Sequence, residues 1–179
     1  KFNTMAEEII KPAEKSEKTR GAAYAVKAKK LSEITHESYG RTTSGIDEFD
    51  NVLGGGIVAG SLILLGGDPG IGKSTLLTQI AAHLSKNKKV LYFSAEESCS
   101  QVKMRAKRLD LDADDFYIIN ETCIDGLENE LDGVEYCIID SIQAVYTDDL
   151  SSSSGSVGQV RECASKIMRI AKSRAITFF

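Results

Sequence analysis

Eight residues from Gly67 to Ser74 read Gly-Asp-Pro-Gly-Ile-Gly-Lys-Ser and match the pattern G-x-x-x-x-G-K-[ST]. Glycines allow the main chain to curl so that successive N–H groups face inward, and a helix that starts there adds partial positive charge. This combination forms a cradle for anions and is typical of a polyphosphate-binding loop. The residues expected to contact the phosphates are Gly67, Asp68, Pro69, Gly70, Ile71, Gly72, Lys73, Ser74 and Thr75.

Three side chains of this loop have distinct predicted roles. Lys73 is expected to reach the outer phosphates and to act in catalysis, while the hydroxyl of Ser74 ligates Mg²⁺. Thr75 is expected to contact the inner phosphate through its hydroxyl and its N–H. The alternative is a glycine turn with an exposed lysine, but the match lies between an expected strand and an expected helix, as a phosphate loop requires.

Carboxylates follow two other apolar runs of the sequence. Asp140 comes after Tyr136–Ile139 and is expected to hold the metal together with Ser74. Glu96 and Glu97 follow Val90–Ala95, and Glu96 is the predicted general base that orients water for attack on a γ-phosphate. Glu97 is expected to assist catalysis or to face a neighbouring subunit. The alternatives are an ordinary turn at Asp140 and, for the glutamates, electrostatic stabilisation of the next helix.

The elements that must position these residues alternate along the chain. This alternation predicts an α/β fold, with a mostly parallel sheet flanked by helices on both faces. In such a sheet the carboxyl ends of the strands meet at one edge, where the candidate residues would come together. The expected strands are Ser61–Leu65, Val90–Ala95, Phe116–Ile119, Tyr136–Ile139 and Ala175–Phe179. The expected helices are 46–53, Lys73–Ser85, 98–109, Ile124–Leu131 and 159–173, with Ser98 and Gln101 forming a capping box.

Composition limits the class of protein. The chain has 179 residues, 42% of them hydrophobic, which suits one medium-sized domain. We expect residues 1–40, which mix Lys and Glu, to be a linker or arm and residues 41–179 to be the domain. The first residue is Lys1 and the last residues form an apolar run, so we expect a piece of a longer protein.

Charge, cysteines and hydropathy point to a cytoplasmic protein without a membrane partner. The net charge of −4 excludes a wholly basic nucleic-acid coat but not a local basic patch. Four widely spaced cysteines contain no Cys-x-x-Cys pair, and this usage fits a reducing compartment. No apolar run approaches the roughly 20 residues that span a bilayer. The absence of an N-K-x-D motif favours adenine over guanine.

A basic helix side and a long loop are the candidate nucleic-acid features. At 100° per residue, Arg161, Lys166, Arg169 and Lys172 share one side of the last expected helix, and Val160, Ala164, Ile167, Met168 and Ala171 share the other. A solvated helix face is the alternative for this basic side. A second cluster, Lys103, Arg105, Lys107 and Arg108, is expected to face solvent. The small-residue loop 147–158 is long enough to be functional.

Several motifs together resemble the bacterial RadA/Sms family of DNA repair proteins over about Leu31 to Phe179. Residues 3–8, Asn-Thr-Met-Ala-Glu-Glu, also look like the segment that follows the zinc ribbon of that family, and the ribbon itself is not in this sequence. The motifs that carry the resemblance are Ser44–Asp50, Leu53–Val58, Gly66–Thr75, Glu96–Ser98, Ile139–Gln143 and Gly155–Cys163.

The resemblance implies a RecA-like P-loop ATPase core that uses ATP and Mg²⁺. It implies DNA-dependent ATP hydrolysis in DNA repair and homologous recombination, with translocation on single-stranded DNA and branch migration of recombination intermediates by a homo-hexamer. In that family the loop after the Asp140 strand lies toward the DNA channel, which favours residues 151–161 for DNA contact. The expected DNA contacts are Ser156 and Arg161 from this stretch and Arg169 from the basic helix side.

Three parts of the family pattern are not found in this sequence. The family's Lys-Asn-Arg-Phe-Gly motif, its γ-phosphate sensor and its C-terminal protease-like domain are absent from it. Hydrolysis by this chain alone therefore stays open. Two alternatives remain: a clock-type or signalling ATPase with a protein target, and a nucleotide-binding fragment without activity of its own.

Overall fold

Four parallel strands form the central sheet of the computed structural model, which describes residues 28, 30–33 and 40–179. Their order is β2-β1-β3-β4, and Ser94 at the end of β1 lies opposite Asn120 of β2 and Asp140 of β3. Three strands therefore end at the same edge. The strands are β1 (Val90–Ser94), β2 (Phe116–Asn120), β3 (Tyr136–Asp140) and β4 (Thr177–Phe178).

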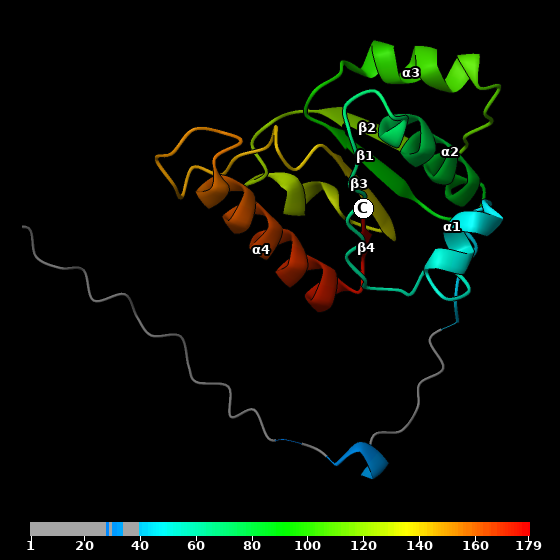
Figure 1. The fold of residues 1–179 in the computed structure, drawn as a ribbon, viewed down its shortest axis with the longest axis horizontal. Coiled ribbons are helices and arrows are strands. Elements are labelled where there is room, and N and C mark those ends of the chain that lie inside the picture. The colour runs from blue at the N-terminus through cyan, green and yellow to red at the C-terminus, as the bar shows by residue number, and fades with distance from the viewer. Residues whose placement is uncertain (1–27, 29, 34–39) are drawn as a thin grey trace, which may run out of the picture. The chain divides into compact units, whose positions relative to one another are not determined.

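Helices cover both faces of this sheet, as predicted. Figure 1 shows α2 and α3 on one side of the strands and α4 on the other. Phe49 of a short helix, α1, packs against the apolar cluster that contains Ile80 of α2. The helices are α1 (Asp47–Val52), α2 (Lys73–Ser85), α3 (Cys99–Arg108) and α4 (Val157–Arg174).

The two faces of the sheet follow from the alternation of side chains along each strand. On β1, Leu91 and Phe93 pack in the cluster that contains Ile167 of α4. The neighbouring residues Val90 and Tyr92 pack in the cluster that contains Ile80 of α2. Because both faces are covered there, β1 and β3 are apolar up to their last residues, Ser94 and Asp140, rather than alternating with polar residues.

Three expected elements differ from the structure. The expected last strand Ala175–Phe179 is shortened to β4, because Ala175 is the C-cap of α4 with a φ of 54°. The expected strand Ser61–Leu65 pairs only at Leu62, which bridges to Phe178; the N–H of Ile63 donates to Phe178 O at 2.8 Å. The expected helix Ile124–Leu131 is instead a 3₁₀ helix, η2 (Leu127–Glu130). Its start is delayed because the N–H of Ile124 donates to Tyr146 O at 3.0 Å, so that backbone is held in a bridge.

The expected arm, residues 1–40, and the segment 3–8 lie almost wholly outside the described residues. The described part of the arm contains one 3₁₀ turn, η1 (Leu31–Glu33). Within the described ranges, no helix combines the length and the apolar character needed to cross a bilayer.

Candidate active site

Two glycines shape the predicted phosphate loop. Gly70 has a φ of 79° and Gly72 a φ of 108°, in the left-handed region that side chains disfavour. A Cβ at either position would meet no atom within 4 Å, so the backbone borders open space. Gly72 is the N-cap of α2, which starts at Lys73 as the sequence predicts.

The start of α2 offers unpaired backbone donors. The N–H groups of Lys73, Ser74 and Thr75 lie in the first turn, where a helix supplies no acceptor, and none donates a hydrogen bond within the described chain. The Nζ of Lys73 donates to Gly67 O at 2.7 Å and to Asp68 O at 2.9 Å. The ammonium group therefore lies over the loop, beside the free amides.

A hollow of about 430 Å³ joins this loop to the carboxyl ends of β1 and β3. Lys73, Ser74 and Thr75 line it together with Glu96, Glu97 and Asp140, so the structure brings together three groups predicted from distant parts of the sequence. The remaining lining residues are Pro69, Gly70, Gly72, Arg105, Arg108, Ser141 and Gln143. Gly67, Asp68 and Ile71 complete the loop outside this lining.

Backbone and side-chain hydrogen bonds fix the acidic side of the hollow. The N–H of Ala95 donates to Asp140 O at 2.8 Å, which joins the ends of β1 and β3. The exposed Glu96 carboxylate accepts a hydrogen bond from the Ser141 hydroxyl. The hydroxyl of Tyr92 donates to Asp140 Oδ2 at 2.5 Å. Glu96 and Asp140 therefore lie at neighbouring strand ends, each with an identified partner.

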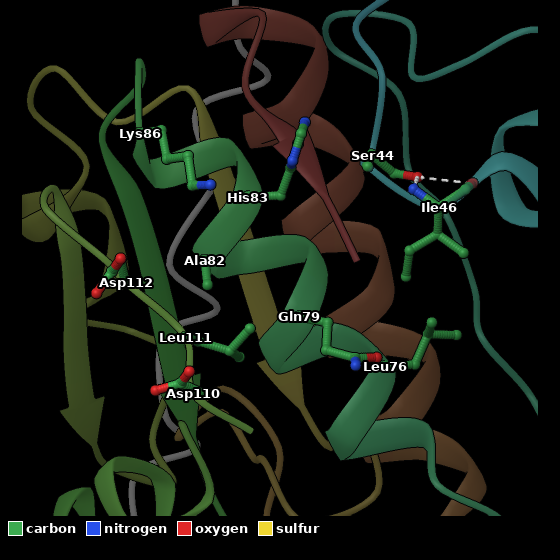
Figure 2. Close-up of a pocket in the computed structure, with 11 residues that line it drawn as sticks. Ser44, Ile46, Leu76, Gln79, Ala82, His83, Lys86, Asp110, Leu111 and Asp112 are labelled. Carbon is green, nitrogen blue, oxygen red and sulfur yellow. Dashed lines mark hydrogen bonds between the residues drawn. The ribbon is translucent and has the colours of Figure 1, made fainter. Parts of the chain in front are cut away.

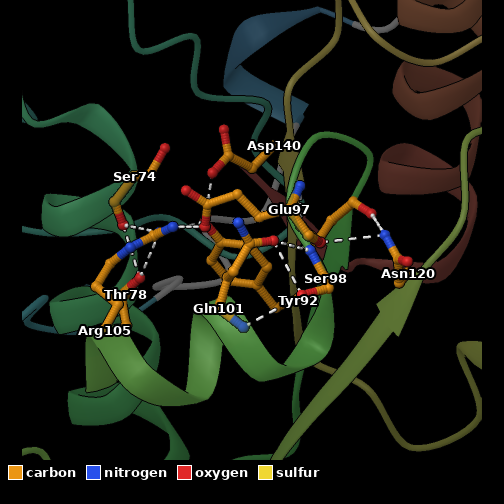
Figure 3. Close-up of polar contacts among 10 residues, drawn as sticks. Ser74, Thr78, Tyr92, Glu97, Ser98, Gln101, Arg105, Asn120 and Asp140 are labelled. Atoms are coloured by element: carbon orange, nitrogen blue, oxygen red, sulfur yellow. Dashed lines mark hydrogen bonds and ion pairs between the residues drawn. The ribbon is translucent and has the colours of Figure 1, made fainter. Parts of the chain in front are cut away.

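Glu97 differs from Glu96 because it forms an ion pair with Arg105 of α3. The expectation that Arg105 faces solvent is wrong: its side chain is 8% exposed and turns toward α2 (Figure 3). It follows the fully buried Val102 by three residues, and this helical spacing is the signal that places it on the inner face. Arg105 and Arg108 are lining residues that the sequence prediction missed.

Tyr92 is the central hydrogen-bonding side chain of this network. Burial, followed by the Asp140 carboxylate, raises the pKa of Tyr92 well above its ordinary value. The phenol therefore stays protonated and donates to Asp140 near neutral pH. Its oxygen also accepts from Arg105 Nη1 at 3.4 Å.

The donors and acceptors of the hollow fit a magnesium–polyphosphate group. Free amides and the Lys73 ammonium suit phosphate oxygens, and the open space beside Gly70 and Gly72 lets the backbone approach them. The Ser74 hydroxyl and the Asp140 carboxylate are oxygen ligands of the kind that Mg²⁺ prefers.

The predicted DNA contacts lie on and before α4, away from this lining. Arg161 is exposed, and Arg169 is exposed with a 3.5 Å ion pair to Glu162. Ser156 is the N-cap of α4, and its hydroxyl accepts from the Gln159 N–H at 3.3 Å. Their role toward DNA stays a prediction.

Two expectations about the α4 faces are wrong. Lys166 is not part of a free basic side, because its Nζ pairs with Asp125 at 2.5 Å and with Asp149 at 2.7 Å. Met168 is 44% exposed rather than inward. The buried stripe of α4 runs through Gln159, Cys163, Ile167, Ile170 and Ala171.

A larger hollow, of about 500 Å³, lies elsewhere on α2 (Figure 2). Gln79 and His83 line it from the helix and Lys86 from the helix C-cap, with Ser44 on one side and Asp110 on another. No residue of the phosphate loop and none of the three site carboxylates borders it. The chemistry therefore belongs to the smaller hollow.

Comparison with known proteins agrees with this geometry. A family model described as "ATPase: KaiC" matches residues 42–132, just over half of the chain. The DNA repair protein RadA of Listeria monocytogenes is 45% identical over 96% of this chain, and that of Haemophilus influenzae is 45% identical over 98%. RadA of Bacillus subtilis is 42% identical over 99%.

The chain spans about two fifths of the length of these curated relatives. These identities confirm the resemblance to the bacterial RadA/Sms proteins over nearly the whole chain. The matched family model includes the phosphate loop and Glu96, and the parallel sheet with helices on both faces is that of a RecA-like P-loop core. The chain therefore belongs to the KaiC-type family of RecA-like ATPases.

Proposed function

We propose that this chain is the ATP-hydrolysing core of a DNA repair protein that uses Mg²⁺ and is stimulated by single-stranded DNA. Its proposed work is translocation on single-stranded DNA and branch migration of recombination intermediates, as a homo-hexamer in the cytoplasm. The observation that carries the proposal is the single hollow in which the phosphate loop meets Glu96 and Asp140. The similarity to RadA proteins supports the DNA substrate.

In this proposal each group of the hollow has one task. The amides of residues 73–75 and the Lys73 ammonium hold the β- and γ-phosphates, while Ser74 and Asp140 hold the metal. Bound Mg²⁺ would neutralise charge on the phosphates. Glu96, oriented by its hydrogen bond from Ser141, accepts the proton of the attacking water. The water oxygen bonds to the γ-phosphorus as the bond to the ADP oxygen breaks.

Replacing the loop lysine tests nucleotide binding. Lys73→Ala removes the only side-chain cation of the loop and is expected to weaken MgATP binding by 100-fold or more, measured by calorimetry. Lys86→Ala, at the C-cap that follows the same helix and outside the active-site lining, is the matched control and should bind as the unmodified protein does. Equal affinities for all three proteins would contradict the assignment of the loop.

The second candidate is a clock-type or signalling ATPase that has the same RecA-like core and acts on a protein target. ATP turnover measured with and without single-stranded DNA distinguishes the two. A DNA-stimulated enzyme should bind DNA less tightly as salt rises, because phosphate contacts release counterions. Turnover that ignores DNA would favour the protein target. An absence of turnover despite MgATP binding would favour a nucleotide-binding fragment.

A further inference from the structure

We propose that Tyr92 and Arg105 are positioning residues that hold the two predicted magnesium ligands, Ser74 and Asp140, in one arrangement. This inference rests on the proposed nucleotide site and gives a role to two side chains that contact its predicted metal ligands. Figure 3 shows Tyr92 and Arg105 between the Ser74 turn of α2 and the carboxylate of Asp140.

Tyr92 fixes the β3 side of the site. Its side chain is 0% exposed, and its ring packs against Phe116 with 5.9 Å between ring centroids, which leaves the hydroxyl little freedom. That hydroxyl donates to Asp140 Oδ2 at 2.5 Å. Among the described residues nothing donates to Oδ1, so Tyr92 orients the carboxylate while leaving one oxygen free.

Arg105 fixes the α2 side of the site. Its Nη1 donates to Ser74 O at 3.0 Å, to Thr78 Oγ1 at 3.2 Å and to the Tyr92 hydroxyl oxygen at 3.4 Å. The Thr78 hydroxyl also donates to Ser74 O at 2.6 Å. The turn that carries Ser74 is thus held by the same guanidinium that contacts Tyr92, and its Nη2 pairs with Glu97.

Replacing either positioning residue should therefore weaken the binding of Mg²⁺ with the nucleotide. Ser74 and Asp140 come from different elements, so their separation depends on the side chains between them. Groups that orient metal ligands typically change metal affinity 10- to 100-fold when they are replaced. Tyr92→Phe removes one hydroxyl and keeps the packed ring. We expect it to raise the Mg²⁺ concentration for half-maximal binding of an ATP analogue about 10-fold or more.

The experiment titrates Mg²⁺ into purified protein with a slowly hydrolysed fluorescent ATP analogue and repeats the nucleotide titration in EDTA. Tyr92→Phe should change the Mg²⁺ midpoint and leave the EDTA affinity within about twofold. Tyr136→Phe is the matched control, a buried tyrosine of β3 at the opposite end of the strand from Asp140. It should leave both values unchanged.

A second variant tests the guanidinium. Arg105→Lys keeps the charge beside Glu97 and loses the fork of donors, so it should raise the Mg²⁺ midpoint in the same direction. Mg²⁺ midpoints within twofold of the unmodified protein for both variants would overturn the inference. If the unmodified protein itself shows no Mg²⁺-dependent nucleotide binding, the proposed function fails instead.

Discussion

Glu96 and Glu97 are adjacent in the chain, yet their carboxylates have different surroundings. Glu96 is exposed at the hollow and accepts from Ser141, whereas Glu97 pairs with the buried Arg105. A general base must reach a water beside the γ-phosphate, and the more accessible carboxylate suits that task. Glu97 is better placed to hold α3 against the end of β1.

Replacing Glu96 should therefore affect ATP turnover, whereas replacing Glu97 should affect stability. Glu96→Gln is expected to slow ATP hydrolysis 100-fold or more and to change the free energy of unfolding by less than about 0.5 kcal/mol. Glu97→Gln leaves Arg105 without its carboxylate partner and should lower the free energy of unfolding. Breaking a buried ion pair costs about 3 kcal/mol or more. Because Glu97 is 36% exposed, we expect a loss of at most about 3 kcal/mol.

Steady-state ATP turnover and urea unfolding measure these two effects. A Glu97→Gln protein that is fully stable but inactive would assign the base to Glu97. A Glu96→Gln protein with unchanged turnover would remove Glu96 from the mechanism.

At the scale of elements, α3 depends on its first turn to present Arg105. The Ser98 hydroxyl accepts from the Gln101 N–H at 3.3 Å, and Gln101 Oε1 accepts from the Ser98 N–H at 2.8 Å, as the capping box predicts. Ser98→Ala should lower the free energy of unfolding by about 1 kcal/mol. Ser100→Ala, on the same exposed turn, is the control. Equal urea midpoints for the two variants would contradict a role for the cap.

The loop before α4 depends on one buried amide. Gln159 is 1% exposed; its Oε1 accepts from the Thr147 N–H at 3.0 Å. Its Nε2 donates to the carbonyls of Thr147, Leu150 and Ser152 at 2.9–3.1 Å. Such contacts hold the base of the loop, whose tip contains the small residues 153–155.

Gln159→Leu keeps the side-chain volume and removes these four hydrogen bonds. The stranded backbone groups should cost about 1–3 kcal/mol, and backbone amides 148–156 should exchange with solvent about 10-fold faster. Hydrogen–deuterium exchange measures this locally. Gln79→Leu on α2 is the matched control, because the side-chain amide of Gln79 lines the larger hollow and makes no hydrogen bond with the described residues. Unchanged exchange in the loop would show that Gln159 does not hold it.

At the scale of the whole molecule, the sequence predicts an element correctly wherever its local pattern agrees with its burial in the fold. The apolar runs of β1 and β3 and the glycine–lysine loop predict the sheet edge and the start of α2, and the structure confirms both. Leu62 shows the limit of such patterns, because an apolar run becomes a strand only where a partner supplies a ladder.

Arg105 shows a second limit. Charged residues are usually exposed, and the burial of Arg105 is made favourable by its partners. These are Glu97, Tyr92, Thr78 and the Ser74 carbonyl, which lie on other elements or far away in sequence. Lys166 follows the same logic on the other face of the sheet, since it is fixed by Asp125 and Asp149. Ion pairs between separate elements depend on the tertiary structure, so the periodicity of a single helix does not predict them.

The ion pairs of Lys166 with Asp125 and Asp149 also make the stability of the protein depend on pH. Partial burial alone would raise the pKa of Asp125, but hydrogen bonds from Lys166, Thr147 and the Asp148 N–H together lower that pKa to about 2. A carboxyl with a lowered folded pKa stabilises the fold above its unfolded pKa, near 3.8, and this contribution is lost as pH falls toward about 2.

The comparison of unmodified protein with Asp125→Asn isolates this contribution. The difference in their free energies of unfolding, from urea titrations, should be constant from pH 7 to pH 5 and should shrink as the pH falls from about 4 toward 2. The reason is that the unfolded carboxyl takes up its proton first, while Lys166 keeps the folded one ionised. A difference that stays the same at pH 5.5 and pH 3 would show that Asp125 and Lys166 do not couple this face of α4 to the fold.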